Sequence, residues 1–409
     1  MSHLIKRFYV LLIILILADN ARILGQDYVP GEVYYGRNEY TAYYPGNLPL
    51  IFSAGHGGSL TPAEIPDRTY GTTVTDSKTI DTALEFRSTI FNATGRYPHI
   101  IINRLKRTKL DPNREIVEAA QGNQWAEQAW YEYHGFIDVA KDSITANFGK
   151  GFYIDVHGHG HSIKRLELGY LISSSNLQRS DSGLNSQSYA NMSSIKALVA
   201  ESPANFPEVL RGSKSLGTLF EERGIPAVPS MNQPDPGAGN PYFSGGYSVE
   251  RHGSRDGGTI SGVQIEAHYE GIRDNATNRR KYAETLMEIL NIYFQEHYGW
   301  EGIVTRVQQI TSAPAEFMLH QNYPNPFNAS TIIRFSLPVA SHATITIFNL
   351  RGEHMETLIS KEFLSGTVDV AWDAADKPSG MYFYQLRVHP IRMKNQTDFV
   401  DYKKLTLIK

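Results

Sequence analysis

The chain has 409 residues, which exceeds one typical domain, and its 41% hydrophobic and 20% charged content is typical of a globular protein with a sizeable core. The formal net charge of -3, with Lys and Arg spread along the chain, argues against a nucleic-acid partner. The absence of Cys excludes disulfides, thiolate metal sites and a Cys nucleophile, so a metal ligand or nucleophile must come from His, Asp, Glu, Ser or water.

Residues 1–25 are predicted to be a signal peptide. Lys6 and Arg7 give the segment a positive start, residues 8–18 form an apolar run, and the small Gly25 marks the cleavage point. A membrane anchor is the alternative, but the apolar run is about half of the roughly 20 residues that a spanning helix needs. No later segment is long and apolar enough to span, so we expect a secreted chain without a stable transmembrane segment.

Residues 26–300 alternate short apolar runs with stretches at helical spacing. Strands that alternate with helices indicate a mostly parallel sheet covered on both sides. We therefore predict an α/β fold, with a three-layer α/β/α catalytic domain in this region. Residues 173–211 are rich in Ser and Asn and are predicted to be an insertion with partial helix. The predicted strands are residues 50–54, 99–103, 151–156, 168–173 and 262–267, and the predicted helices are residues 77–93, 114–146 and 278–297.

The pattern changes after residue 300. Residues 301–315 are predicted to be a linker, because the sequence TSAPAEF in this region has neither helical nor strand periodicity. In residues 316–409, strand-like runs such as 344–348 and 381–387 alternate with turn residues. This alternation is typical of a small antiparallel β-sandwich.

Polar side chains cluster at the carboxyl ends of the predicted strands of the first domain. His56 follows the first strand, Arg104 follows the second, and Glu266 lies at the end of the last. His157 lies at the end of the third strand, two residues after Asp155. Ligands of open α/β sheets bind outside the carboxyl ends of the strands, so we expect these side chains to converge on one crevice.

This set of residue types suits the hydrolysis of an amide. Two imidazoles and a carboxylate can hold zinc with an open position for water, and zinc lowers the pKa of that water to about 7. His56 and His157 are the candidate zinc ligands, and Glu266 is the candidate base that takes the proton of the water. Arg104 or Arg114 can clamp a substrate carboxylate with two parallel hydrogen bonds. Asp155 is expected to orient an imidazole.

Each of these assignments has a simpler alternative. His56 stands between glycines and could be only a turn residue. His157, His159 and His161 alternate along an extended segment and could be a solvated histidine run. Glu266 taken alone could be a surface residue of a strand, and only the expected convergence of strand ends favours a catalytic role.

Four short motifs occur in order between residues 48 and 292. They are Ser-Ala-Gly-His-Gly-Gly at residues 53–58, Asp-Pro-Asn-Arg at 111–114, Ile-Asp-Val-His-Gly at 154–158 and Val-Gln-Ile-Glu at 263–266. Together they resemble the motifs of N-formylglutamate amidohydrolases, and Asp-Pro-Asn-Arg resembles an element shared with the wider zinc carboxypeptidase superfamily. The resemblance implies that His56 and His157 bind the metal and that Glu266 is the general base. It also implies that Arg114, with Asn113 beside it, binds the substrate carboxylate or polarises the scissile carbonyl.

The third metal ligand departs from the carboxypeptidase pattern. Carboxypeptidases place a ligand glutamate three residues after the first histidine, but position 59 is Ser in this chain. The nearest carboxylates are Glu64 and Asp67, on a loop flanked by prolines. Glu64 is preferred, because a late carboxylate suits the amidohydrolase branch.

The C-terminal region contains several separated motifs in order. They are Gln-Asn-Tyr-Pro-Asn-Pro-Phe-Asn at residues 321–328, Ser-Thr-Ile-Ile at 330–333, Ile-Phe-Asn-Leu-Arg-Gly at 347–352, Ser-Gly-Met-Tyr at 379–382 and Lys-Leu-Thr-Leu-Ile-Lys at 404–409. Over roughly the last 93 residues the chain resembles the type IX secretion system sorting domain of the Bacteroidetes. The resemblance implies export through the periplasm, recognition by the secretion machinery and later removal of the domain. An ordinary immunoglobulin-like or carbohydrate-binding sandwich is the alternative.

The sequence thus predicts a secreted or cell-surface zinc-dependent amidohydrolase that cleaves an amide bond of an N-acyl or N-formyl amino acid or a short peptide. A secreted carboxypeptidase or a cell-wall amidase with the same metal site is the enzymatic alternative. A surface binding or adhesion protein without catalysis is the alternative from another class. The metal content of the purified protein discriminates between them, since an amidase of this kind must hold zinc.

Overall fold

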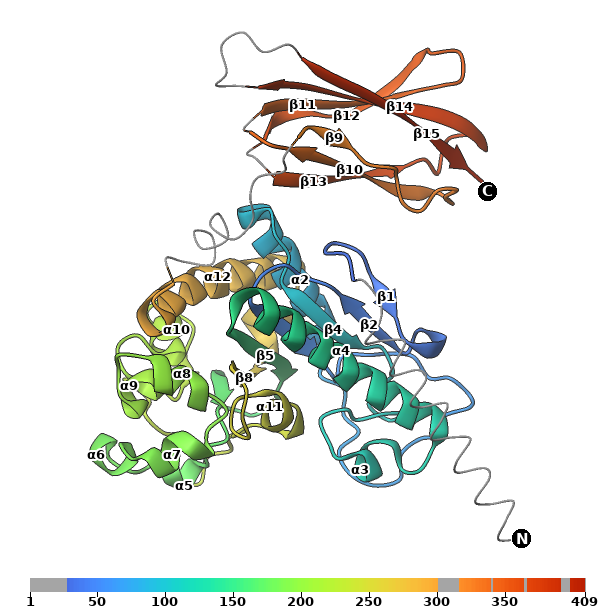
Figure 1. The fold of residues 1–409 in the computed structure, drawn as a ribbon. Coiled ribbons are helices and arrows are strands. Elements are labelled where there is room, and N and C mark those ends of the chain that lie inside the picture. Colours follow the sequence, from blue (N-terminus) through green and yellow to red (C-terminus); the bar gives the residue numbers. More distant parts are fainter. Residues whose placement is uncertain (1–27, 301–315, 340, 364–365, 391–397, 409) are drawn as a thin grey trace. The chain divides into compact units, whose positions relative to one another are not determined.

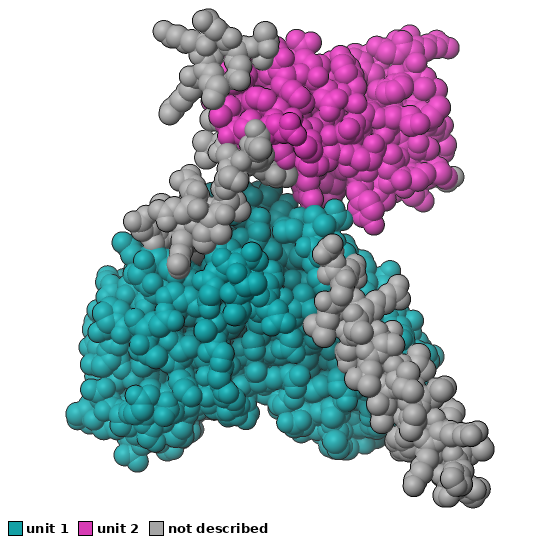
Figure 2. Space-filling model, viewed as in Figure 1, with its two compact units in different colours: residues 1–306 teal, residues 307–409 magenta. Residues whose placement is uncertain are grey.

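The computed structural model describes residues 28–300, 316–339, 341–363, 366–390 and 398–408. The chain divides into two compact units, Met1–Arg306 and Val307–Lys409 (Figure 2). The predicted signal peptide (1–25) and the predicted linker (301–315) lie outside the described residues. Within the described residues, no helix combines the length and the apolar character that crossing a bilayer requires.

The first unit contains one eight-stranded mixed sheet. Its strands are β1 Tyr34–Tyr35, β2 Thr41–Tyr44, β3 Leu50–Ala54, β4 His99–Asn103, β5 Gly151–Gly158, β6 Leu166–Gly169, β7 Ala227–Val228 and β8 Ile260–Ala267. The order across the sheet is β1-β2-β4-β3-β5-β8-β6-β7. The four central strands, β4, β3, β5 and β8, run parallel, whereas β2 and β6 pair antiparallel with the outer two of these strands. The predicted α/β class is confirmed, and the sheet is mixed rather than mostly parallel throughout.

Helices cover both faces of the central strands (Figure 1). The helices α2 (Thr79–Thr94) and α12 (Ala276–Tyr298) cover one face, where Phe86 of α2 packs on Phe52 of β3 at a ring distance of 4.9 Å. The helix α4 (Gln124–Phe148) covers the other face, and its Tyr133 joins a buried cluster with residues of β3, β4 and β5. Because helices cover both faces, β3 and β4 are buried along their whole length, and their sequences form continuous apolar runs.

The single helix predicted over residues 114–146 is two helices, α3 (Ile116–Ala120) and α4. Gln121 and Gly122 have positive φ angles of 49° and 78°, which ends α3. The side chain of Asn123 then accepts hydrogen bonds from the backbone N–H groups of Trp125 and Ala126 and caps α4. The prediction of one continuous helix is therefore wrong, because a left-handed turn and a new N-cap interrupt the apolar pattern.

The segment predicted to be an insertion with partial helix contains short helices. The strand predicted over residues 168–173 corresponds to β6, which begins and ends earlier, at Leu166 and Gly169. It runs antiparallel to β8. The short helices of the first unit are α5 Ser174–Leu177, α6 Asp181–Leu184, α7 Gln187–Met192, α8 Lys196–Glu201, α9 Phe206–Arg211, α10 Leu216–Glu221 and α11 Tyr247–His252, with the irregular turns η1 Arg37–Glu39 and η2 Tyr269–Arg273.

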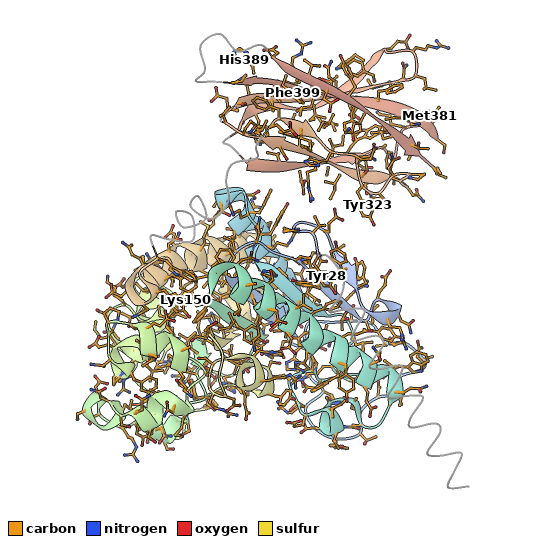
Figure 3. All side chains as sticks on the ribbon, in the orientation of Figure 1. Tyr28, Lys150, Tyr323, Met381, His389 and Phe399 are labelled. Atoms are coloured by element: carbon orange, nitrogen blue, oxygen red, sulfur yellow. The ribbon has the colours of Figure 1, made fainter. Side chains whose placement is uncertain are left out.

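The second unit consists of antiparallel strands in two sheets. One sheet has the order β13-β10-β9 and the other β12-β11-β14-β15. Buried side chains of both sheets form one hydrophobic cluster, which includes Ile333 and Trp372 from the first and Ile345 and Tyr384 from the second. Met381 lies at the surface of this unit (Figure 3). The strands are β9 Met318–Leu319, β10 Ser330–Leu337, β11 Ser341–Phe348, β12 His354–Phe363, β13 Gly366–Asp373, β14 Gly380–Pro390 and β15 Phe399–Leu407.

Candidate metal centre

The carboxyl ends of β3, β5 and β8 bring three of the predicted site residues together. His56 lies two residues after β3, His157 lies near the end of β5, and Glu266 lies near the end of β8. The parallel register of β5 and β8 puts His157 opposite Glu266. The ring centroids of His56 and His157 are 4.6 Å apart, and all three side chains are buried. The strand ends therefore enclose one buried polar site.

A carboxylate oxygen of Asp76 faces both histidines. Asp76 Oδ2 is 3.1 Å from Nδ1 of His56 and 3.2 Å from Nδ1 of His157. The backbone N–H of Gly158 donates to the same oxygen at 3.3 Å. Asp76 precedes α2, and its own N–H donates to the carbonyl of His56 at 3.1 Å, which ties this loop to the end of β3. His56, Asp76 and His157 thus form a compact group with the donor types of a metal site.

The second nitrogen of each imidazole contacts another buried carboxylate. His56 Nε2 is 2.6 Å from Oδ1 of Asp111, and His157 Nε2 is 2.8 Å from Oδ2 of Asp155. Ser53 donates its hydroxyl to the other oxygen of Asp155 at 2.5 Å. Metal-binding histidines commonly have their outer nitrogen held by a carboxylate in this way, which fixes the tautomer and the ring orientation. The contact between Asp155 and an imidazole was expected from the sequence, whereas that of Asp111 was not.

The distances from Asp76 Oδ2 to the two inward nitrogens are compatible with a shared metal ion such as zinc. Ligands at the usual zinc distances of about 2.0–2.1 Å stand roughly 3.3 Å apart in a tetrahedron. The observed separations of Asp76 Oδ2 from the two Nδ1 atoms, 3.1 and 3.2 Å, are close to this value. Two imidazoles and one carboxylate are also the three protein ligands of many catalytic zinc sites, in which the fourth position is left to water. The residues present therefore fit the predicted cofactor.

The structure does not bring Glu64 to the histidines. Glu64 is exposed, and its carboxylate accepts the hydroxyl hydrogen of Tyr40. The alternative ligand, Asp67, is also exposed and pairs with Lys109 at 3.0 Å. The carboxylate that the structure does bring to the two histidines is that of Asp76, 20 residues after His56. Asp76 belongs to no local motif, so sequence reasoning had no signal for it.

Burial and charge shift the pKa values of these groups in opposite directions. Burial raises the pKa of the Asp76 carboxyl, but the neighbouring His56 and His157 outweigh it and hold that pKa well below its usual range. Burial lowers the pKa of the His157 imidazole, but the charge and hydrogen bond of Asp155 raise it well above its usual value. Without a metal, these shifts favour the carboxylate form of Asp76 and the cationic form of the His157 imidazole.

Glu266 has a different environment from the three aspartates. Its Oε1 accepts a hydrogen bond from Nε2 of Gln264 at 2.9 Å. Burial raises the pKa of Glu266 to about 7, opposed by the charge of His157 and assisted by that of Asp76. A carboxyl with a pKa near neutrality can both accept and return a proton. Glu266 is therefore the group of this site best suited to proton transfer.

The Asp-Pro-Asn-Arg segment is held in place by α4. Trp130 Nε1 donates to the carbonyl of Arg114 at 2.9 Å, and His134 Nε2 lies 3.0 Å from the carbonyl of Pro112. Trp130 and His134 are one helical turn apart, so the same face of α4 holds both carbonyls. The side-chain amide of Asn113 lies 3.4 Å from His157 Nε2 and 3.3 Å from the Gln264 side-chain carbonyl. Asn113 is thus part of the site.

The two candidate clamps differ in their surroundings. Arg114 follows directly on Asn113, is about one third exposed, and pairs with Glu118 at 3.3 Å. Arg104 donates to the Glu39 carboxylate at 2.8 Å and lines a cavity of about 340 Å³ together with Ile80 of α2. Arg114 is therefore next in the chain to Asn113, whereas Arg104 shares its cavity with Gly57 and Gly58, which follow His56.

Two buried arginines, Arg107 and Arg273, lie close to the polar site. Arg107 Nε donates to Oδ2 of Asp111 at 3.0 Å, and its Nη1 is 3.5 Å from Oδ1 of Asp76. Arg273 Nε donates to the carbonyl of Ala267 at 3.1 Å. A Cβ atom at Gly158 would lie 2.4 Å from Cζ of Arg273, so a side chain at that position would displace this guanidinium. Sequence reasoning missed both arginines, since Arg107 stands in a charge-rich stretch and Arg273 belongs to no motif.

Comparisons with known proteins assign the C-terminal unit. Residues 321–396 match the family described as "Secretion system C-terminal sorting domain", which confirms the predicted type IX sorting domain. No curated protein matches the chain.

Three solved structures resemble the chain at low identity. Gene product Atu2144 from Agrobacterium tumefaciens is 11% identical, with a TM-score of 0.39 over 63% of this chain and 94% of its own. Dimeric latent PorU from Porphyromonas gingivalis is 14% identical, with a TM-score of 0.20 over 24% of this chain and 10% of its own. The endo-beta-1,4-mannanase from Thermotoga petrophila is 10% identical, with a TM-score of 0.16 over 71% and 45%. None of these likenesses assigns a function to the N-terminal unit.

Proposed function

We propose that the N-terminal unit is a zinc-dependent amidohydrolase that cleaves an amide bond of an N-acyl or N-formyl amino acid or a short peptide. The observation that carries this proposal is the arrangement of His56 and His157. Each turns Nδ1 toward the same oxygen of Asp76 and has Nε2 on a separate buried carboxylate. A solvated histidine run has no need for such a buried, doubly held pair, whereas a metal site does.

The residues divide the work of hydrolysis between metal binding and proton transfer. His56, Asp76 and His157 would hold the zinc. When bound, zinc polarises the scissile carbonyl and lowers the pKa of a water molecule. Glu266 accepts the proton of the attacking water and releases it later in the cycle.

Substrate binding would fall to the Asp-Pro-Asn-Arg segment. A guanidinium forms two parallel hydrogen bonds to a carboxylate, which suits Arg114 to the free carboxylate of an amino-acid or peptide substrate. The amide of Asn113 lies next to the outer nitrogen of the His157 imidazole, and its Oδ1 accepts the backbone N–H of Ser248, so Asn113 anchors the segment that carries Arg114. The bonds from α4 to the carbonyls of Pro112 and Arg114 keep this segment rigid.

The second unit accounts for the location of the protein. The sorting domain implies export to the cell surface or the medium by the type IX secretion machinery. We further propose that its two sheets pack as a sandwich, since one hydrophobic cluster contains side chains of both. Export makes a substrate found outside the cell, such as an acylated amino acid or a cell-wall peptide, more suitable than an intracellular metabolite. A carboxypeptidase or cell-wall amidase would use the same metal site.

The decisive experiment measures zinc content and turnover in the purified full chain and in Glu266→Gln. The variant keeps the size and hydrogen bonding of the side chain but cannot take a proton. We expect it to retain zinc and to lose about a hundredfold to ten-thousandfold in kcat on an N-acyl or N-formyl amino acid. Glu284→Gln, the same change at an exposed glutamate of α12, is the control.

Two results would contradict the proposal. A wild-type chain that binds no zinc stoichiometrically favours the binding or adhesion protein. If Glu266→Gln turns over substrate as fast as Glu284→Gln, then Glu266 is not the base. Arg114→Lys keeps the charge but loses the planar two-pronged donor. It should therefore raise KM while the zinc content stays close to that of the wild type.

A further inference from the structure

A second carboxylate–histidine pair lies one strand away from Glu266. Glu167 of β6 is paired directly with Glu266 of β8, which in turn is paired with His157 of β5. Opposed residues of antiparallel strands have Cβ atoms about 4.5–5.5 Å apart and point to the same face. Glu167 is fully buried, and its Oε1 is 3.0 Å from Nδ1 of His161. His157, Glu266 and Glu167 therefore lie side by side on the neighbouring strands β5, β8 and β6, and His161 joins them through Glu167.

The carboxylate of Glu167 is firmly held, and it orients His161. The backbone N–H of Phe243 donates to Oε2 of Glu167 at 2.9 Å, and Arg165 Nε is 3.8 Å from Oε1. The His161 ring stacks on Phe243, with centroids 4.8 Å apart and planes 10° from parallel. Its side chain is 21% exposed, and Nε2 has no hydrogen-bond partner among the described residues. One nitrogen is thus fixed by a buried acid while the other is free to meet a ligand.

This geometry is that of an acid–base histidine rather than of a second metal site. A carboxylate on Nδ1 fixes the tautomer and stabilises the protonated imidazole, which leaves Nε2 to exchange a proton with a reactant. The ligand atoms of His159, His161 and Glu167 are close enough together to hold a metal. However, His159 Nδ1 accepts the backbone N–H of His161 at 3.1 Å, and His159 Nε2 lies 2.7 Å from the carbonyl of Arg165. Both nitrogens of His159 are therefore already used.

We propose that His161 is a second acid–base residue of the amidohydrolase site and that it protonates the leaving nitrogen of the substrate. This inference rests on the proposed function of the N-terminal unit. The water oxygen bonds to the scissile carbon while its proton passes to Glu266. The C–N bond breaks as the nitrogen takes the proton of His161 Nε2, so that the amine leaves neutral. Glu266 then releases its proton to solvent and His161 takes one up from solvent, which restores both groups. Glu167 is the positioning residue of this pair.

The test compares two substrates that share one acyl group but differ in the leaving group. An amide nitrogen must be protonated to leave, whereas the nitrophenolate of a nitrophenyl ester leaves without a proton. In the full chain, His161→Gln should lower kcat on the amide about a hundredfold to ten-thousandfold and change kcat on the ester only a few-fold. Glu167→Gln should act in the same direction more weakly, because it leaves the imidazole in place. His389→Gln, at an exposed histidine of the second unit, is the control for the same change.

The possible outcomes distinguish the role of His161 from the proposed amidohydrolase function on which that role rests. If His161→Gln slows amide and ester equally, or slows neither, His161 does not protonate the leaving group and the inference is overturned. If the wild type holds more than one zinc per chain and His161→Gln loses one of them, the second metal site is correct instead. A wild type that hydrolyses neither substrate contradicts the proposed function, and the role of His161 with it.

Discussion

Asp76 shows how a single carboxylate can organise a buried pair of histidines. Its Oδ2 faces Nδ1 of both His56 and His157, while its Oδ1 is 3.5 Å from the guanidinium of Arg107. A buried charge without partners costs several kcal/mol, so this carboxylate is stable only because cations or a metal surround it. The same arrangement makes Asp76 the residue on which metal binding should depend most directly.

Asp76→Asn should weaken zinc binding, whereas Glu64→Gln should not. The amide that replaces Asp76 is a poorer zinc ligand than a carboxylate and removes one negative charge from the site. Glu64 is exposed and bound to Tyr40, so its replacement should leave zinc in place. Zinc per chain, measured after dialysis against a weak chelator, checks both variants. Equal zinc loss in the two would restore Glu64 as a ligand.

The buried carboxyl of Glu266 should make the metal-free protein less stable as the pH rises. The folded chain binds this proton more tightly than the unfolded chain, since burial raises the pKa from 4.5 to about 7. The contribution to the free energy of unfolding is therefore fully present below about pH 4.5 and is lost as the pH rises through 7. Its size is on the order of 3 kcal/mol.

Urea unfolding between pH 5 and 8, run on the metal-stripped chain, measures this effect. Glu266→Gln cannot ionise, so its stability should fall less steeply with pH than that of the wild type. Glu284→Gln, at an exposed site, should follow the wild type. Parallel curves for all three proteins would show that Glu266 ionises normally in the folded state.

At the scale of elements, the turn after β3 positions His56. The N–H groups of Ser59 and Leu60 both donate to the carbonyl of Arg104, at 3.0 and 2.9 Å. Gly58 lies so close to this strand end that a Cβ atom would be 2.3 Å from the carbonyl oxygen of Leu105. Backbone cannot move aside as a flexible side chain can, so the close approach of the two segments requires glycine here.

Gly58→Ala should lower both stability and zinc affinity. Forcing a methyl group against backbone typically costs about 1–3 kcal/mol, and relief of the clash would shift the turn that carries His56. Gly160→Ala is the matched control, since no atom lies within 4 Å of its Cβ position. Thermal unfolding and zinc titration of the two variants check the prediction. Equal behaviour of both variants would mean that the turn relaxes without cost.

At the scale of the whole molecule, the chain contains two compact units that each have their own hydrophobic clusters. One cluster of the first unit lies between its sheet and α4, another joins loop residues to α3 and α4, and that of the second unit is built from residues 319–407. Units with separate cores can fold independently. His56, Asp76, His157 and Glu266 all belong to the first unit.

A chain that ends at residue 306 should fold and keep its zinc but should not leave the periplasm. Its core and its site residues are all retained, whereas the sorting domain is removed. A cooperative thermal transition, zinc content and fractionation of cells that express the truncated chain are the measurements. An insoluble product, or export equal to that of the full chain, would contradict the prediction. Intact mass of the exported full-length protein shows in addition whether residues 1–25 and the sorting domain are removed.

The sequence by itself determines the features that depend on local patterns of residues, such as apolar runs and contiguous motifs. The bounds of β3 and β4 follow from apolar runs, and His56, His157 and Glu266 were found because each stands at a strand end. The sorting domain was recognised from contiguous motifs, which need no knowledge of contacts. Periodicity and motif spacing report on neighbours along the chain, and this is why these features were accessible.

Only the tertiary structure decided which carboxylate meets each imidazole. Asp76 reaches His157 from 81 residues away, and Asp111 reaches His56 from 55 residues away. Nothing in a loop sequence specifies such a contact, because it depends on how helix and sheet pack and where the loop between them then lies. For the same reason the sequence did not reveal that Asp76, rather than Glu64, lies beside the two histidines, or that Glu167 lies beside Glu266. A strand pattern predicts that a side chain lies on one face of a sheet, but the order and register of the strands determine what lies beside it.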